Sequence, residues 1–298
     1  MSKHAYCIIA HADQYCLETL LKLLNDNRND LYLLFDKKSS ISVNQLVSHQ
    51  DICNLHILDN QIDIRWGGTS QVKAELALFD AVTNSRVEYD YIHLLSGADL
   101  PIKNQDEIHN FFDSLAKGTN MIGFAQGNFN RLDLKEKTEY YHLFVEYQKG
   151  CNPLLRKFCK FCRQAWISFQ DTFGLKRTYP DISELYKGAN WISITGELCN
   201  YIVSQEKRIL SLFKGVPCAD EIFLQTIVAN SPYANTVFDY GKDFAGGTRV
   251  IDWTRGKPYT WRASDFDFLM KSDGLFARKF SSSVDRDIID KIYTSIKM

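Results

Sequence analysis

The chain has 298 residues, of which 45% are apolar, so it can bury a sizeable core as one large α/β domain or two small ones. Its 35 basic and 36 acidic side chains nearly cancel, which excludes the strongly basic balance typical of nucleic-acid binding proteins. The first apolar run, residues 6–10, is too short for a signal sequence, and no later stretch is long and apolar enough to cross a bilayer. We therefore expect a cytoplasmic protein.

Strand and helix patterns alternate along the first third of the chain. Residues 6–10 are a compact apolar run typical of a buried parallel strand, and residues 16–24 carry apolar side chains at helical spacing. Further strands are predicted at 31–35, 54–58 and 91–95, residues 62–66 alternate like a strand that Gly67-Gly68 stops, and Ser70 is predicted to cap a helix. Such a series favours a mainly parallel sheet with helices on both faces.

Three polar or aromatic residues fall where predicted strands end. They are Asp36, Trp66 and Asp99. In parallel α/β sheets the ligand lies beyond the carboxyl ends of the strands, so these residues are candidate ligand contacts. A turn residue at Asp36 and core packing of Trp66 are the alternatives.

The middle of the chain, residues 125–187, is less regular and contains a basic aromatic segment at 156–177. Six basic side chains stand there against one acid, Asp171, with Phe158, Phe161, Trp166 and Phe169 between them. The pattern is commonly an amphipathic helix with a solvated basic face. It also fits a patch that docks on anionic lipid, at the inner face of the cell membrane, or on an anionic acceptor.

The last third is predicted to contain strands at 191–194 and 249–253, a helix at 198–212 and a helical run at 222–229. The sequence shows no repeat, low-complexity stretch or clear linker, so we expect one domain over residues 1–298. The eight cysteines are expected to be reduced thiols. Cys159 and Cys162 form a lone CxxC with no second pair at zinc-finger distance, so no structural zinc is expected.

Transfer of a sugar from a nucleotide donor needs a nucleotide pocket, positive charge at the leaving diphosphate and a carboxylate that takes the acceptor's proton. Many such enzymes supply the charge with a divalent cation held by Asp-x-Asp at a strand end. The two such motifs here, Asp265-Phe266-Asp267 and Asp285-Arg286-Asp287, follow no apolar strand, and we expect surface carboxylates on C-terminal helices.

Cationic side chains are then the expected source of the positive charge. The best candidates are Arg278 and Lys279, with Lys257 as a third. Most basic pairs are simple surface charge, which is the alternative. The apolar neighbours Phe276 and Phe280 favour a fixed position.

Short segments in a fixed order along nearly the whole chain carry a family resemblance. They are Ala10-His11, Phe35-Asp36-Lys37, Trp66-Gly67-Gly68-x-Ser70, Leu95-Ser96-Gly97-Ala98-Asp99-x-Pro101, Gly188-Ala189-Asn190-Trp191, Asp220-Glu221-x-Phe223, Arg249-Val250-Ile251-Asp252-Trp253 and Phe276-Ala277-Arg278-Lys279-Phe280. Together they resemble the family of core-2/I-branching β-1,6-N-acetylglucosaminyltransferases and peptide O-xylosyltransferases.

The resemblance implies a GT-A-type fold, a Rossmann-like sandwich with a central, mostly parallel sheet flanked by helices. It implies an inverting mechanism without a metal or other cofactor, in which GlcNAc, xylose or galactose is transferred from a UDP-sugar. Residues 1–125 are then the donor-binding part and residues 126–298 the acceptor and catalytic part. The animal enzymes carry a membrane anchor, a stem and disulfides, none of which this sequence shows, so a bacterial-type enzyme acting on a glycan or lipid-linked acceptor is implied.

The resemblance also implies roles for individual residues. Glu221 is the catalytic base; Arg278, Lys279 and, less directly, Lys257 bind the diphosphate; Ala10 and Asp36 contact uridine; Ile64, Arg65 and Trp66 contact the donor; Asn190 and Trp191 line the transferred sugar. Asn190 stands where the family often has an acid, which leaves the donor sugar open.

The position of Glu221 agrees with the role of base but does not by itself separate it from a simple helix-terminal charge, so the resemblance decides. Glu221 opens the predicted run at 222–229, where backbone N–H groups favour an ionised carboxylate that can accept a proton. A simple helix-terminal charge has the same pattern, and Asp220 is expected only to support it. A glycoside hydrolase would need two carboxylates flanking the bond, which sequence neighbours do not easily do. A catalytically silent nucleotide- or sugar-binding protein is the other alternative, against which the retention of Glu221, Arg278 and Lys279 argues.

Overall fold

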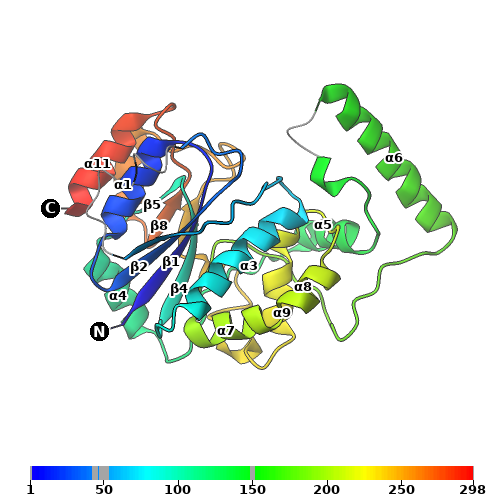
Figure 1. Cartoon of the computed structure of the whole chain (residues 1–298), viewed down its shortest axis with the longest axis horizontal. Helices are drawn as coiled ribbons and strands as arrows, with labels where there is room; N and C mark the ends of the chain where they lie inside the picture. The colour runs from blue at the N-terminus through cyan, green and yellow to red at the C-terminus, as the bar shows by residue number, and fades with distance from the viewer. Residues whose placement is uncertain (1, 42–45, 47–53, 148–151, 298) are drawn as a thin grey trace.

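The computed structural model describes residues 2–41, 46, 54–147 and 152–297, and its centre is a five-stranded sheet (Figure 1). The strands lie in the order β3-β2-β1-β4-β6; all are parallel except β6, which pairs antiparallel with β4. They are β1 (His4–Ala10), β2 (Asn29–Phe35), β3 (Leu55–Ile57), β4 (Tyr91–Ser96) and β6 (Ser193–Thr195). The predicted α/β architecture with a mainly parallel sheet is confirmed.

A second, three-stranded sheet brings the C-terminal part of the chain to the end of β4. Its strands are β5 (Asp99–Pro101), β8 (Phe276–Arg278) and β7 (Arg249–Ile251), in the order β5-β8-β7. The antiparallel register of β5 and β8 sets Asp99 opposite Arg278. Two candidate residues far apart in the sequence are thereby fixed side by side.

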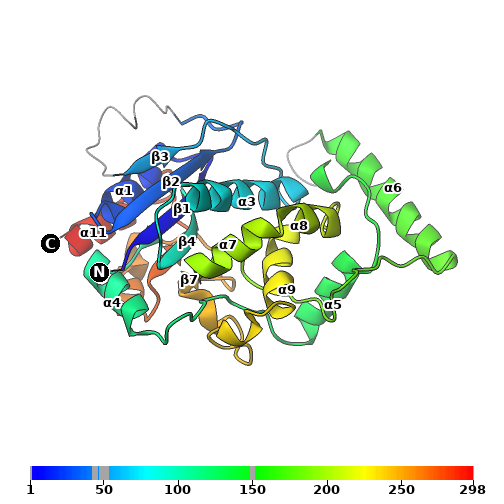
Figure 2. The ribbon, with the colours of Figure 1, turned by 60° about the horizontal axis from the view of Figure 1, so that its bottom comes forward.

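Helices cover both faces of the central sheet (Figures 1 and 2). Because side chains alternate along a strand, Tyr6 and Ile8 of β1 join the core under α1, α4 and α11, and Ala5 and Cys7 join the core under α3, α7 and α9. These helices are α1 (Gln14–Leu24), α3 (Thr69–Asn84), α4 (Gln105–Ser114), α7 (Gly196–Ser204), α9 (Phe223–Ala229) and α11 (Arg286–Lys297). In the described part of the chain, no helix combines the length and apolar character needed to cross a membrane.

The irregular middle of the chain builds two further helices. They are α5 (Asn128–Thr138) and α6 (Pro153–Thr172). In both views α6 lies at the edge of the molecule, on the opposite side from α1 and α11 (Figures 1 and 2).

Several local predictions differ from the structure. The predicted helix at 198–212 is two helices, α7 and α8 (Glu206–Leu212), and residues 62–66 contribute only an isolated bridge between Asp36 and Ile62. The predicted Ser70 cap is wrong: α3 begins at Thr69 after Gly68 without a side-chain cap. The Ser70 hydroxyl instead accepts a hydrogen bond from the Arg65 N–H (2.9 Å), a contact that stabilises the preceding turn.

Candidate functional site

The carboxyl ends of β1, β2 and β4 meet at one edge of the central sheet. The Asp36 N–H donates to the Ala10 carbonyl at 2.9 Å, and the Asp36 side chain is buried. A Cβ at Gly97 would lie 3.4 Å from the Ala10 Cβ, so the turn after β4 packs tightly against the end of β1. This close packing brings Ala10 and Asp36 to one place.

The Lys38 ammonium contacts three polar groups beside the end of β2. It lies 3.2 Å from Asp36 Oδ1 and 2.5 Å from Asp63 Oδ1, and it donates to the Ile64 carbonyl at 2.6 Å. Hydrogen bonds from Lys38 and then Arg65 hold the pKa of Asp63 below its usual value. The predicted donor contacts Asp36, Ile64 and Arg65 are thus assembled around a lysine that the sequence analysis did not single out.

The Trp66-Gly67-Gly68 turn connects this group to the second half of the chain. The Gly67 carbonyl accepts a hydrogen bond from the Cys218 N–H at 2.9 Å, and Gly67 has a φ of +72°, which favours glycine. A Cβ at Gly68 would collide with the Glu146 carboxylate. The Trp66 side chain is half exposed at the rim of the turn, so a ligand can reach it.

Glu221 sits in a short 3₁₀ turn, η2 (Ala219–Glu221), and α9 begins two residues later. The prediction that Glu221 opens the helix is therefore wrong. Charged side chains, not the start of a helix, surround its carboxylate. The ammonium groups of Lys137 and Lys187 lie 3.5 and 3.6 Å from Glu221 Oε2, and both also contact Asp133. Burial alone would lower the pKa of Lys137, but the charge of Glu221 raises it above its ordinary value.

Asp220 points into the protein, away from Glu221's partners. Its Oδ2 accepts hydrogen bonds from Gln71 (3.0 Å) and Asn190 (3.4 Å). Burial, followed by the nearby charge of Glu221, raises the pKa of Asp220 to about 7. Burial also raises the pKa of Glu75, which α3 places one turn beyond Gln71. The supporting role of Asp220 stays a prediction.

Arg278 is held from three directions. Its Nη1 donates to Ser96 Oγ at 2.5 Å and to Asp99 Oδ1 at 2.6 Å, and its guanidinium lies 4.0 Å from the centre of the Trp191 ring. Asp99 is only 1% exposed, so this ion pair is shielded from water on the carboxylate side. Among the described residues, Nε and Nη2 of Arg278 have no hydrogen-bond acceptor, which leaves them available to a ligand.

Lys279 and Lys257 lie near Arg278 with fewer constraints. The Lys279 N–H faces the Tyr259 carbonyl at 3.5 Å, which sets Lys279 beside the segment that follows Lys257. As far as the structure describes the chain, neither ammonium has a carboxylate within 4.0 Å. The predicted anchoring by Phe276 and Phe280 is confirmed, because both rings are fully buried.

The first aspartate of each Asp-x-Asp motif has a structural role, and the second, Asp267 or Asp287, is exposed as predicted. Asp265 is mostly buried and pairs with Arg255 at 2.7 Å, so its predicted surface position is wrong. Asp285 accepts hydrogen bonds from the N–H groups of Ala263 (3.0 Å) and Ile288 (3.2 Å) at the start of α11. Across residues 2–41, 46, 54–147 and 152–297, no cluster of three or more His, Cys, Asp or Glu side chains is arranged as a metal site.

The cysteines in the described ranges are free thiols: Cys7, Cys16, Cys159, Cys162, Cys199 and Cys218. Cys53 and Cys151 lie outside the described residues.

A path of contacts joins the candidate base to the candidate diphosphate ligand. Glu221 adjoins Asp220, Asp220 accepts from Asn190, and Trp191, the next residue, stacks under Arg278. The sequence analysis missed four residues that contact the candidate site residues Asp36 and Glu221 or their partners. They are Lys38, Lys137, Lys187 and Asp133. The spacing of Lys137 four residues after Asp133 was the one available signal, since such pairs share a helix face.

Comparisons with known proteins give the following matches. Residues 4–268 match the family model described as Core-2/I-Branching enzyme. The relatives include a xylosyltransferase of Ciona intestinalis, 21% identical over 93% of this chain and 32% of its own length, and xylosyltransferase 1 of Homo sapiens, 22% identical over 93% of this chain and 28% of its own. The chain therefore spans about a third of the length of the curated relatives it matches. Mouse xyloside xylosyltransferase 1, in its apo form, aligns with a TM-score of 0.39 at 12% identity, covering 93% of this chain and 97% of that one.

Proposed function

The chain belongs to the Core-2/I-Branching enzyme family, a family of glycosyltransferases, and on this premise we propose that it is an inverting, metal-independent sugar transferase. It moves GlcNAc, xylose or galactose from a UDP-sugar to a hydroxyl group of a glycan or lipid-linked acceptor.

The path from Glu221 to Arg278 supports the proposal most directly. It links the segment that carries a partly exposed carboxylate to a fixed guanidinium, through Asp220, Asn190 and Trp191. A single displacement at a sugar carbon needs both groups, a proton acceptor on the attacking side and positive charge on the leaving side.

The reaction then proceeds in one step. The acceptor hydroxyl oxygen forms a bond to the anomeric carbon as Glu221 takes the hydroxyl proton, and the bond from that carbon to the diphosphate oxygen breaks. UDP leaves with its negative charge against Arg278 and Lys279, with Lys257 next to them. Lys137 and Lys187 hold the Glu221 carboxylate in position.

The donor's nucleoside lies at the ends of β1 and β2 in this proposal. Ala10 and Asp36 contact uridine, and Ile64, Arg65 and Trp66 line the rest of the donor. The contacts of Lys38 with Asp36 and with the Ile64 carbonyl support a common pocket. Residues 1–125 thus supply most donor contacts, and residues 126–298 supply the base, the diphosphate ligands and the acceptor side.

Titration calorimetry with UDP in the presence of EDTA tests the proposal, followed by turnover assays with UDP-GlcNAc, UDP-xylose and UDP-galactose. We expect UDP to bind without a divalent cation and one donor to be consumed. Binding that appears only after Mn²⁺ is added would overturn the metal-independent mechanism. Tight UDP binding without consumption of any donor would favour the catalytically silent nucleotide-binding protein.

A further inference from the structure

Helix α6 takes no part in the candidate site, and its surface is unlike the rest of the molecule. More than half of the large apolar side chains that the described residues expose lie between residues 141 and 175. On α6 itself Leu154 is 75% exposed, Phe158 60% and Phe161 70%. Concentrated exposure of this kind marks an interaction surface rather than scattered surface residues.

The exposed apolar side chains share one face of the helix. At 100° per residue, Leu154, Phe158, Phe161, Ala165 and Phe169 fall within one stripe. A helix that is merely solvated would carry polar side chains there. The apolar stripe therefore argues against a simple solvated helix.

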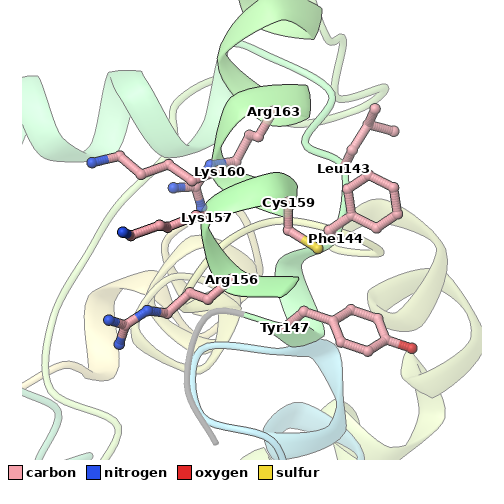
Figure 3. A pocket seen from close by; sticks show the side chains of 8 residues that line it. All are labelled: Leu143, Phe144, Tyr147, Arg156, Lys157, Cys159, Lys160 and Arg163. Atoms are coloured by element: carbon pink, nitrogen blue, oxygen red, sulfur yellow. The ribbon is translucent and has the colours of Figure 1, made fainter. Parts of the chain in front are cut away.

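The other side of α6 is basic. Four cations extend to the same side of the helix in Figure 3, and they line a pocket of about 410 Å³ together with Leu143, Phe144, Tyr147 and Cys159. The cations are Arg156, Lys157, Lys160 and Arg163. Within the described ranges, none of the four has a carboxylate within 4.0 Å. Their charge is left for an anionic partner outside the chain.

Charge complementarity selects the partner. A second copy of this chain packed on the basic side would bring the same four cations to the contact and be repelled. A bilayer containing anionic lipid offers both components, since its phosphates match the cations and its acyl chains match the apolar stripe.

We propose that α6 lies in the headgroup region of an anionic lipid bilayer, with its apolar stripe among the acyl chains and Arg156, Lys157, Lys160 and Arg163 on lipid phosphates. This goes beyond the proposed function, because binding to lipid requires neither donor nor turnover. A single amphipathic helix gives reversible, peripheral binding.

The docked helix would lie close to the candidate donor residues. Tyr147 lines the basic pocket, and the Arg65 guanidinium lies 5.2 Å from the centre of the Tyr147 ring. The neighbouring Glu146 accepts a hydrogen bond from Ser70 at 3.2 Å. Bilayer contact at α6 would therefore hold the Trp66-Gly67-Gly68 turn near the lipid surface.

Vesicle flotation of the full chain tests the proposal. We expect the protein to float with phosphatidylcholine vesicles that contain phosphatidylglycerol and to stay behind with phosphatidylcholine alone. Lys157→Gln with Lys160→Gln should weaken partitioning about 25-fold, from about fivefold for each basic side chain at an anionic surface. Phe158→Ser should weaken it about 30-fold, through loss of one buried aromatic side chain.

Matched variants separate this surface from general effects. Phe268→Ser removes a phenylalanine of equal exposure, 59%, and Lys22→Gln with Lys207→Gln removes two exposed lysines elsewhere; both should float as the unchanged chain does. Absence of flotation, equal flotation with neutral vesicles, or equal losses in the control variants would each overturn the proposal. So would light scattering that shows a dimer abolished by Phe158→Ser, because the stripe would then serve a second copy.

Discussion

Charged side chains at the carboxyl edge of the central sheet have partners within the chain, whereas basic side chains on helix α6 have no carboxylate partner in the described residues. At the edge, Arg278 is held by Ser96 and Asp99, and Glu221 lies between two lysines. On α6, Lys157 and Lys160 have no carboxylate partner in the part of the chain that the structure describes.

This difference separates two kinds of recognition. Charges fixed by their neighbours are oriented before a ligand arrives, which is what stabilisation of a transition state requires. Charges without internal partners gain their largest interactions from an outside surface. Substitutions at the edge should therefore change chemistry, and substitutions on α6 should leave both chemistry and folding nearly unchanged.

Glu221→Gln should give the largest effect at the edge. The amide keeps the shape of the side chain and one acceptor oxygen but cannot take the acceptor proton, so transfer should fall by about 10³-fold. UDP affinity measured by calorimetry should change little, because the proposed mechanism puts Glu221 on the acceptor side. Glu206→Gln, on the exposed start of α8, is the control. Unchanged turnover in Glu221→Gln would remove Glu221 from the role of base.

Arg278→Ala combined with Lys279→Ala should weaken UDP binding by about 3 kcal/mol, the worth of two charge-assisted hydrogen bonds. Calorimetry measures the change, and Lys271→Ala with Arg286→Ala removes a comparable pair outside the site. An unaltered dissociation constant in the first double variant would show that the diphosphate lies elsewhere and that the fixed guanidinium is structural.

Much of the fold could be predicted from the sequence because its signals are local. The apolar runs that become β1, β2 and β4 are buried strands, and a parallel sheet brings their carboxyl ends together wherever the connections run. The approximate place of the site, and the residues at those strand ends, follow from that geometry alone.

The surroundings of Glu221 could not be predicted in the same way. Lys137 is 84 positions earlier in the chain and comes from the irregular middle, and the close approach depends on tertiary packing. Ser70 shows the same limit on a smaller scale. Its sequence position suits a helix cap, but contacts with Arg65 and Glu146 take its hydroxyl instead. Local propensity is overridden where distant segments meet.

Acid should destabilise the sheet region through buried histidines at the opposite end of the strands. The His4 ring contacts the rings of His93 and His109, and burial lowers the pKa of His4 to about 2 and lowers that of the other two. An unfolded histidine takes up a proton below about pH 6.5. Above pH 6.5, His4 therefore does not lower the free energy of unfolding. Below pH 6.5, protonation of His4 in the unfolded chain lowers the free energy of unfolding by up to about 1.4 kcal/mol per pH unit, until the pH approaches 2.

Denaturant titrations between pH 6.5 and 5 check this, with His4→Gln for comparison. The raised pKa of Asp220 has the opposite effect on stability, because the folded protein binds a proton there that the unfolded chain does not. This effect is the same in the unchanged protein and in His4→Gln, so it cancels in the comparison. The unchanged chain should lose stability more steeply than His4→Gln. Parallel slopes would mean that His4 stays accessible to protons in the folded state.

Phe158→Ser should give the smallest effect, less than about 0.5 kcal/mol on the free energy of unfolding, because an exposed ring loses little on replacement. Phe276→Ala is the contrast: its fully buried ring packs between the two sheets, and its loss should cost about 3–5 kcal/mol. Chemical denaturation without lipid measures both. A Phe158→Ser penalty close to that of Phe276→Ala would show that the apolar stripe of α6 is packed within the chain. In that case α6 would not differ from the carboxyl edge of the sheet, because its side chains would also be held by neighbours within the chain.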